Sequence, residues 1–288
     1  MSEFQIMSAL VTPFMKSGAI DYEALGNMVE EQLTQGVDGL IVCGTTGEAA
    51  TMKEYERFDV LRFVIDRTHH QVPLWFGCGT NHTKETLSLV KKVANYDIDG
   101  LLLVTPYYNK PSQQGLYRHF QTIAESTQLN IMLYEVASRC GVAFEKETLC
   151  RLFHDCPNIT AFKYAGHDYS LITSLHKSHP RIHLYSGEDA TFYEGMDHGL
   201  SGVISVMSNV YLKEMKEYVE TRSDHLKQYL QQVAALCFLE CSPSAIKYML
   251  YRERKCENCL RLPLVPLSNA SAQMIDTFMK HDKIHQFL

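Results

Sequence analysis

The stretch Gly39-Leu-Ile-Val-Cys43 is a continuous apolar run that leads directly into the loop Gly44-Thr-Thr-Gly-Glu48. Strands of a parallel sheet that is buried on both faces have this pattern, whereas half-exposed strands alternate apolar with polar residues. The same pattern recurs along the chain, where short apolar runs alternate with segments whose apolar residues have helical spacing. We therefore expect parallel strands that are connected by helices.

Eight strands are predicted, and eight strand–helix units favour a closed (β/α)8 TIM barrel, which is an α/β fold. The predicted strands are 6–11, 39–43, 74–77, 100–104, 130–134, 159–163, 182–186 and 202–206. The clearest predicted helices lie near 53–67, 83–96, 114–126, 146–153 and 190–198. An open doubly wound sheet is the alternative, but no GxGxxG motif follows the first strand. We expect residues 1–210 to form the barrel and residues 211–288 to form a C-terminal helical region packed on it.

Composition indicates a soluble globular protein. Of the 288 residues, 45% are hydrophobic and 21% are charged, and the formal net charge is −6. This charge, without a basic run, gives no reason to expect nucleic acid as a partner. Residues 1–11 do not resemble a secretory signal, and no apolar run is long enough to span a bilayer. A cytoplasmic protein without a membrane partner is therefore expected.

The nine cysteines are an odd number, which favours free thiols in a reducing compartment over a disulfide framework. Cys256 and Cys259 form a lone CxxC motif. A zinc site needs two further ligands at a suitable spacing, and none is evident nearby. The histidines include no HExxH pair. We expect no metal site, and we interpret the CxxC thiols as incidental.

In a barrel of this kind the active site lies at the carboxyl ends of the strands. The polar residues that follow the predicted strands are Thr45, Thr46, Thr105, Tyr107, Tyr108, Tyr134, Arg139, Lys163 and Gly187-Glu-Asp189. Each has a structural alternative: threonines form turns, strand-end tyrosines bond to backbone carbonyls, and arginines form surface ion pairs. Their common position at one predicted rim favours the functional interpretation.

Lys163 follows the apolar strand Ile159-Thr-Ala-Phe162 and is the centre of this set. A desolvated lysine ionises less readily, so its neutral amine can attack a ketone and form an imine. The alternative is a lysine whose ammonium group reaches water. A tyrosine phenol can transfer protons during imine formation, and Arg139 can bind a substrate carboxylate. The set indicates an imine-forming lyase or aldolase that acts on a 2-oxo acid.

These residues lie in motifs that resemble the dihydrodipicolinate synthase/N-acetylneuraminate lyase family, from about Gln5 to Lys280. The motifs are Ala9-Leu-Val-Thr-Pro13, Gly44-Thr-Thr-Gly-Glu48, Val104-Thr-Pro-Tyr-Tyr-Asn-Lys-Pro-Ser-Gln-Gln-Gly-Leu-Tyr117, Ser186-Gly-Glu-Asp189, Gly202-Val-Ile-Ser205 and Arg261-Leu-Pro-Leu-Val-Pro266. The Tyr107-Tyr-Asn109 block and the threonine pair favour the synthase branch over the sialic-acid lyase branch.

The resemblance implies a role for each matched residue. Lys163 would form a Schiff base with pyruvate, and Tyr134 would donate and accept protons. Thr45 and Tyr108 would complete the relay, with Tyr108 reaching in from a neighbouring subunit. Thr46 and the backbone of Ile204 would hold the pyruvate carboxylate, and Arg139 would hold that of L-aspartate 4-semialdehyde. The resemblance further implies a homotetramer of tight dimers, no metal or organic cofactor, and a place in diaminopimelate and lysine biosynthesis.

Two segments depart from the family pattern close to the predicted catalytic groups. Where the family usually reads Tyr-Asn-Val-Pro-Ser-Arg-Thr-Gly, the chain has Tyr134-Glu-Val-Ala-Ser-Arg-Cys-Gly141, so that Glu135 adds a carboxylate and Ala137 removes a rigid turn residue. Where the family has an acid and then Ser/Thr-Gly after the lysine, the chain has Lys163-Tyr-Ala-Gly-His167.

Two alternative functions follow from these departures. A sister aldolase would cleave N-acetylneuraminate or a 2-keto-3-deoxy sugar acid, and Glu135 favours it as a group able to bond sugar hydroxyls. Arg139 favours a short carboxylated aldehyde instead. The second alternative is a barrel that has lost catalysis and binds a metabolite or partner.

The resemblance also suggests an effector site for lysine. The matching positions are Ala49, Asn81, Glu85 and Tyr107. Two histidines that are usual in lysine-sensitive bacterial forms are replaced by Glu54 and Arg57. We therefore expect weak or absent inhibition by lysine.

Overall fold

The computed structural model of the chain describes residues 4–282. Its eight parallel strands form a closed barrel in sequential order, which confirms the predicted (β/α)8 fold. The strands are β1 (Gln5–Ala9), β2 (Gly39–Val42), β3 (Leu74–Gly77), β4 (Gly100–Val104), β5 (Asn130–Glu135), β6 (Ile159–Tyr164), β7 (His183–Ser186) and β8 (Gly202–Ser205). None of the helices within residues 4–282 is long and apolar enough to cross a membrane.

The chain is organised into two compact units, which do not coincide with the barrel and the helical region. Unit 1 contains the described residues up to Gln5 together with Leu74–Ile204, and unit 2 contains Ile6–Pro73 together with the residues from Ser205 onward. The boundary predicted at residue 210 stays a prediction.

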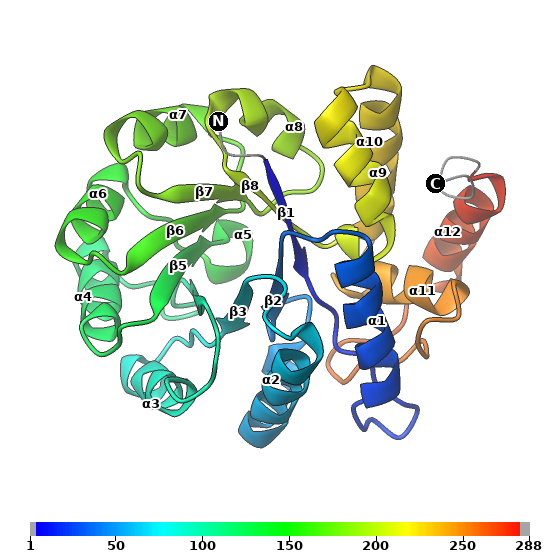
Figure 1. The fold of residues 1–288 in the computed structure, drawn as a ribbon, viewed down its shortest axis with the longest axis horizontal. Coiled ribbons are helices and arrows are strands. Elements are labelled where there is room, and N and C mark those ends of the chain that lie inside the picture. Colours follow the sequence, from blue (N-terminus) through cyan, green and yellow to red (C-terminus); the bar gives the residue numbers. More distant parts are fainter. Residues whose placement is uncertain (1–3, 283–288) are drawn as a thin grey trace. The chain divides into compact units, whose positions relative to one another are not determined.

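Unit 1 carries strands β3 to β8 and the helices that connect them. Its helices are α3 (Thr83–Val93), α4 (Gln113–Ala124), α5 (Ala137–Cys140), α6 (Lys146–Asp155), α7 (Tyr169–Ser178), α8 (Phe192–Gly195) and the 3-10 turn η2 (Met196–His198). In Figure 1, β5, β6 and β7 run side by side, and α4 packs next to α6. The Ser112 hydroxyl accepts the N–H of Gly115 and caps α4, as helix N-termini require.

A row of register partners crosses unit 1 near the carboxyl ends of its strands. Val104 pairs with Tyr134, Tyr134 with Lys163, Lys163 with Tyr185, and Tyr185 with Gly202. Because side chains alternate between the faces of a strand, the register decides which residues share a face. The row places Lys163 between two tyrosines.

Unit 2 carries β1 and β2 and the remaining helices. These are α1 (Tyr22–Thr34), the 3-10 turn η1 (Ala49–Thr51), α2 (Glu54–Thr68), α9 (Ser208–Thr221), α10 (Asp224–Cys237), α11 (Ser244–Arg252) and α12 (Asn269–His281). The Asp21 carboxylate accepts the N–H of Ala24 at 3.0 Å and caps α1. Asn209 donates to the carbonyl of Ala9 at 2.9 Å and accepts the N–H of Val11 at 3.1 Å, which ties α9 to β1.

The structure corrects several predicted bounds. The helix expected over 190–198 is instead the short helix α8 followed by η2, and the loop expected around Arg139 contains the one-turn helix α5. The first strand ends at Ala9 rather than at residue 11, and α3 ends at Val93 rather than at residue 96. One-turn helices are too short to produce an apolar period, so only tertiary contacts define them.

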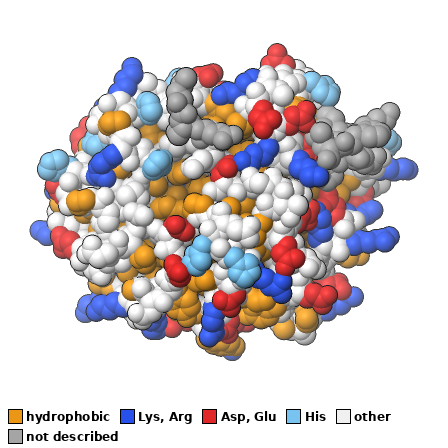
Figure 2. All heavy atoms as spheres, viewed as in Figure 1, with side chains coloured by type: hydrophobic (Ala, Val, Ile, Leu, Met, Phe, Trp, Pro, Cys, Tyr) orange, Lys and Arg blue, Asp and Glu red, His pale blue; other side chains and the backbone are white. Residues whose placement is uncertain are grey.

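Charged side chains of both signs are distributed over the surface. On the face that Figure 2 shows, Asp and Glu are interspersed with Lys and Arg rather than gathered into one field.

Candidate active site

Lys163 is buried near the carboxyl end of β6, with only 7% of its surface exposed. Its Nζ lies 4.4 Å from the centroid of the Tyr134 ring, which belongs to its register partner on β5. The alternative that the lysine head reaches water is therefore wrong. The structure brings together the residue predicted to form the imine and the residue predicted to transfer its protons.

The surroundings of Lys163 favour its neutral amine. Burial is the main cause that lowers its pKa from 10.5 to about 8, and the positive charge of Arg139 acts in the same direction. The carboxylates of Asp189 and Glu188 act in the opposite direction. With this pKa roughly one molecule in ten carries a neutral amine at pH 7, against about one in three thousand for an ordinary lysine. The amine is therefore able to act as a nucleophile near neutral pH.

The turn Ser186-Gly-Glu-Asp189 approaches the lysine closely. A Cβ on Gly187 would lie 3.0 Å from the Cε of Lys163, so a side chain at this position would press on the lysine. Asp189 is buried, and burial raises the pKa of the half-buried Glu188. The hydroxyl of Ser186 accepts the N–H of Glu188 at 3.0 Å and fixes the turn.

Glu188 and Asp189 were among the rim residues noted in the sequence, but no role was predicted for their carboxylates, whose charges act on Lys163. The signal in the sequence was the acidic pair directly after a strand end, at the rim where barrel active sites lie.

Arg139 lies on α5, which Gly141 ends with a positive φ of 73°. Its side chain is exposed, and its guanidinium acts electrostatically on both Lys163 and Glu188. An exposed arginine that influences a buried lysine is suited to binding an anionic substrate beside it. The role of Arg139 in binding a substrate carboxylate stays a prediction.

Glu135 faces away from Lys163 and Tyr134. It follows Tyr134 on β5, and successive residues of a strand point to opposite faces. Its carboxylate is buried and accepts the N–H of Phe144 at 2.5 Å, and burial raises its pKa. The carboxylate therefore closes the segment that carries Arg139. This geometry gives no support to Glu135 as a ligand for sugar hydroxyls.

The second departure from the family pattern begins with Tyr164, which follows Lys163 on β6 and therefore points to the other face of the sheet. Tyr164 packs its ring against Gly166, where a Cβ would lie 2.5 Å from a ring atom, and its hydroxyl accepts the N–H of Asp168 at 3.3 Å. The Nδ1 of His167 lies 3.5 Å from the hydroxyl oxygen of Thr191. Ala165 lies nearer to Lys163, since its Cβ and the Cε of Lys163 are both 3.0 Å from the place that a Cβ on Gly187 would occupy.

Tyr108 is held in an unusual backbone conformation with its side chain in solvent. Its φ is +74°, and its side chain is 89% exposed. A tyrosine with positive φ is strained, and an aromatic ring is rarely left so exposed without a partner. Tyr108 therefore does not pack against Lys163 of the same chain.

Two of the four predicted effector residues are in direct contact. The side-chain amide of Asn81 donates to the carbonyl of Tyr107 at 3.1 Å, and that of Asn109 donates to the carbonyl of Asn81 at 2.9 Å. Glu85 lies in the first turn of α3 in the same unit, and Ala49 begins η1 in unit 2. The effector site stays a prediction.

Thr45 and Thr46 lie in unit 2, in the tight loop between β2 and η1. Thr45 is exposed and Thr46 is buried. The carbonyl of Thr45 accepts the N–H of Glu48 at 3.1 Å, which closes the loop as a turn. Ile204, in unit 1, is buried at the carboxyl end of β8. The pyruvate-binding roles of Thr46 and Ile204 stay predictions.

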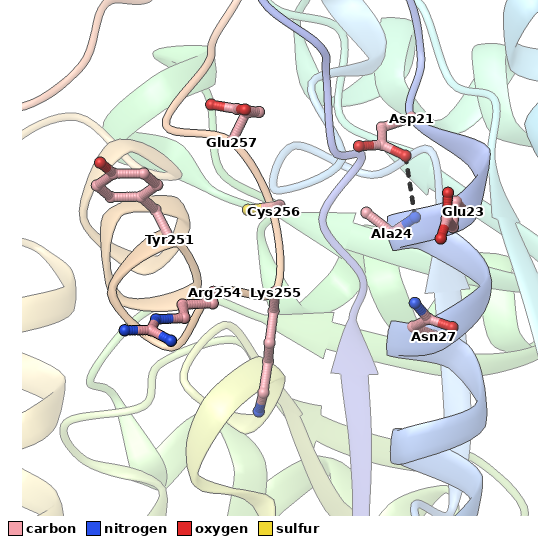
Figure 3. A pocket seen from close by; sticks show the side chains of 9 residues that line it. All are labelled: Asp21, Glu23, Ala24, Asn27, Tyr251, Arg254, Lys255, Cys256 and Glu257. Atoms are coloured by element: carbon pink, nitrogen blue, oxygen red, sulfur yellow. Dashed lines mark hydrogen bonds between the residues drawn. The ribbon is translucent and has the colours of Figure 1, made fainter.

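Unit 2 also contains a pocket of about 400 Å³ between the start of α1 and the segment that follows α11 (Figure 3). Three of its five charged residues are already engaged: Asp21 caps α1, Lys255 pairs with Glu31 and Glu253, and Glu257 lies 3.9 Å from the Nζ of Lys16. Cys256 lines it, but burial raises the pKa of its thiol to about 11, so the thiol stays protonated at neutral pH. None of the predicted site residues lines this pocket.

The predicted absence of a disulfide framework agrees with the structure, in which the nine cysteines, all within residues 4–282, form no disulfide. Within residues 4–282, no group of three or more His, Cys, Asp or Glu side chains is arranged to hold a metal ion.

Comparison with known proteins identifies the class to which this site belongs. Residues 3–282 match the Dihydrodipicolinate synthetase family. The chain is 38% identical over 283 residues to a 4-hydroxy-tetrahydrodipicolinate synthase of Chelativorans sp. strain BNC1, covering 96% of this chain and 97% of the relative. The chain therefore belongs to the dihydrodipicolinate synthetase family.

Solved structures agree with this assignment. A monomeric dihydrodipicolinate synthase variant has a TM-score of 0.92 and 36% identity, over 97% of this chain and 96% of that one. A chloride-inhibited dihydrodipicolinate synthase of Acinetobacter baumannii, complexed with pyruvate, has a TM-score of 0.90 and 33% identity, over 97% and 98% of the two chains.

Proposed function

We infer that the protein is a lyase with 4-hydroxy-tetrahydrodipicolinate synthase activity, which condenses pyruvate with L-aspartate 4-semialdehyde in diaminopimelate and lysine biosynthesis. The observation that carries this inference is the buried Lys163, whose pKa is about 8 and whose Nζ lies against the Tyr134 ring. Its near full-length relatives with this name support the same activity.

The chemistry follows from the nucleophilic amine. The neutral amine of Lys163 attacks the ketone carbon of pyruvate, and the carbinolamine loses water to form an imine. Loss of a methyl proton gives an enamine, whose carbon attacks the aldehyde of the second substrate. The phenol of Tyr134 is proposed to carry the protons of these steps. This scheme requires no metal or organic cofactor.

The other assignments rest on the resemblance to the family. Thr45 and Tyr108 complete the proton relay, and Thr46 and the backbone of Ile204 bind the pyruvate carboxylate. Arg139 binds the carboxylate of the semialdehyde. Its influence on Lys163 supports this last role, since a guanidinium close to the amine would bring the two substrates together.

We further propose that Tyr108 acts in the site of a neighbouring subunit, in a homotetramer of tight dimers. The exposure of its ring and its strained backbone support this role, because both are explained by a partner surface. The four positions Ala49, Asn81, Glu85 and Tyr107 are proposed as a weak lysine site. A lysine titration that gives half-inhibition in the low-micromolar range would contradict the weakness of this site.

Two measurements test the proposed function. Borohydride reduction in the presence of pyruvate should add the mass of a reduced pyruvate imine to Lys163. A coupled assay with both substrates should show turnover in the wild type and none in Lys163→Ala. Turnover that survives in Lys163→Ala would overturn the mechanism, and wild-type protein without an adduct would favour a barrel that only binds a metabolite.

A further inference from the structure

Glu48 and Lys247 form an ion pair from which water is excluded. Their side chains are fully buried, and the Nζ of Lys247 lies 2.5 Å from the Oε1 of Glu48. Lys247 belongs to α11, and Glu48 ends the threonine loop, which comprises Gly44-Thr-Thr-Gly-Glu48. Desolvation of two charges costs several kcal/mol for each ion, so a buried pair contributes little net stability. Its position beside a functional loop suggests a role other than stability.

The threonine loop is bounded by two residues in the left-handed region. The φ of Cys43 is 55° and the φ of Glu48 is 53°. A residue with a side chain is strained in such a conformation, which persists only where its surroundings hold it. The loop therefore does not keep its shape through local preference, and contacts from elsewhere must fix it.

The ion pair supplies these contacts. The Oε2 of Glu48 accepts the backbone N–H of Arg261 at 3.2 Å, and Lys247 donates to the carbonyl of Thr12 at 2.9 Å. The hydroxyl of Thr12 in turn donates to the carbonyl of Gly47 at 2.7 Å. A Cβ on Gly47 would lie 3.1 Å from the carbonyl oxygen of Leu10, which shows how closely this part of the loop packs on the chain after β1.

An aromatic ring completes the arrangement. Both the Nζ of Lys247 and the guanidinium carbon of Arg261 lie 4.3 Å from the centroid of the Phe14 ring. Cations over an aromatic face are attracted by its quadrupole, more strongly where water is excluded. The end of the loop is thus held by Lys247 and Arg261 of the C-terminal helical region and by the segment after β1.

We propose that Lys247 and Glu48 are positioning residues, which fix the threonine loop so that the hydroxyls of Thr45 and Thr46 are set to receive pyruvate. Neither residue touches the substrate. The proposal rests on the proposed function, because it assigns the purpose of the loop from the pyruvate-binding roles of the two threonines. It gives the C-terminal helical region a part in the first half of the reaction.

The experiment compares three variants in the full-length protein. Lys247→Met leaves Glu48 buried without its partner, Lys247→Met combined with Glu48→Met removes both charges, and Lys247→Arg keeps the charge with a different head group. For each, the KM for pyruvate, the KM for the semialdehyde, kcat, the rate of borohydride trapping at Lys163 and the Tm are measured. The trapping rate is normalised to the folded protein.

The double variant separates positioning from stability. Removing both charges leaves no uncompensated ion, so its Tm should return close to the wild-type value. Its KM for pyruvate should nevertheless stay roughly tenfold or more above wild type, with slower trapping, since small displacements of binding groups have effects of this size. The KM for the semialdehyde should change by less than about twofold. Lys247→Arg should fold and should also raise the KM for pyruvate.

Lys255→Met is the matched control. Lys255 is also a lysine of the C-terminal region in ion pairs, with Glu31 at 2.8 Å and Glu253 at 2.7 Å. Its ion-pair partners among the described residues lie outside the threonine loop. This variant should keep the wild-type KM for pyruvate, and an equal rise would overturn the proposal.

Wild-type pyruvate kinetics in both the double variant and Lys247→Arg would also overturn it and leave the proposed function intact. A wild-type protein that forms no adduct at Lys163 would overturn the proposed function itself.

Discussion

At the scale of the single residue, the reactivity of Lys163 depends on a balance of opposing charges. Burial and Arg139 lower its pKa, while Asp189 and Glu188 raise it, and the result is about 8. The rate of borohydride trapping with pyruvate should therefore rise about tenfold between pH 6 and pH 7 and level off above the pKa. A rate that is independent of pH, or a midpoint near 10, would contradict this account of the lysine.

The two neighbours of opposite charge allow the balance to be tested in both directions. Arg139→Gln removes a positive charge that disfavours the ammonium form, so the midpoint of the trapping profile should move to higher pH. Glu188→Gln removes a negative charge that favours the ammonium form, so the midpoint should move to lower pH. Midpoints that move together would show that general loosening of the site, rather than charge, sets the pKa of Lys163.

The same burial of Lys163 should lower the stability of the fold. In the unfolded chain the lysine has its ordinary pKa of 10.5, so it binds its proton more tightly there than in the native state. The penalty is complete below pH 8 and fades as the pH rises from 8 to 10.5. Lys163→Met should therefore raise the free energy of unfolding by roughly 1–3 kcal/mol at pH 7, with less gain at pH 10.

Denaturant unfolding of both proteins at the two pH values measures this difference, and Lys163→Arg is the control that keeps a buried charge. If Lys163→Met gains the same free energy of unfolding at both pH values, the cause of the gain is packing rather than ionisation.

At the scale of the element, the segment from Glu135 to Phe144 positions Arg139. Glu135→Leu removes the acceptor for the N–H of Phe144 and leaves a buried donor unpaired, which costs about 1–3 kcal/mol. We expect the KM for the semialdehyde to rise by roughly tenfold, while trapping of pyruvate at Lys163 changes little. Glu135→Gln is the matched control, because its amide oxygen still accepts this N–H. The measurement is steady-state kinetics with each substrate varied in turn. An equal KM for the semialdehyde in Glu135→Leu and Glu135→Gln would contradict the prediction.

The same segment shows where prediction from the sequence fails. The strand–helix alternation predicted β5 and β6 correctly, because buried strands and amphipathic helices each have a local apolar period. The single turn of α5 has no such period, and the bond from Phe144 to Glu135 spans nine residues. Glu135 was therefore interpreted as a free carboxylate in the sequence, although the structure engages it.

At the scale of the whole molecule, the sequence predicted the closed barrel and the rim on which the candidate residues lie, since both follow from repetition. It did not predict the pair of Lys247 and Glu48, which are 199 residues apart. Isolated lysines and glutamates are almost always surface residues, so only the packing of α11 reveals that these two are buried. The division into two units was not predicted either, because no linker marks it in the sequence.

Tyr108 is the residue that makes the oligomer testable through activity. If its hydroxyl serves the site of a partner subunit, Lys163→Ala and Tyr108→Phe damage different halves of a shared site. Mixed dimers then contain one complete site, built from the Lys163 of one subunit and the Tyr108 of the other. Random pairing should restore up to roughly a quarter of the wild-type sites, because half of the dimers are mixed and each regains one of its two sites.

The mixture is prepared by dissociating and reassembling the two inactive variants and is compared with each variant treated alone. Activity should rise with the fraction of mixed dimers measured by native mass spectrometry. A mixture that forms mixed dimers without gaining activity would place the action of Tyr108 within its own chain. That outcome would leave the exposed ring and the positive φ of Tyr108 without a cause. Restored activity would account for both, because a partner subunit would then cover the ring and hold the strained backbone.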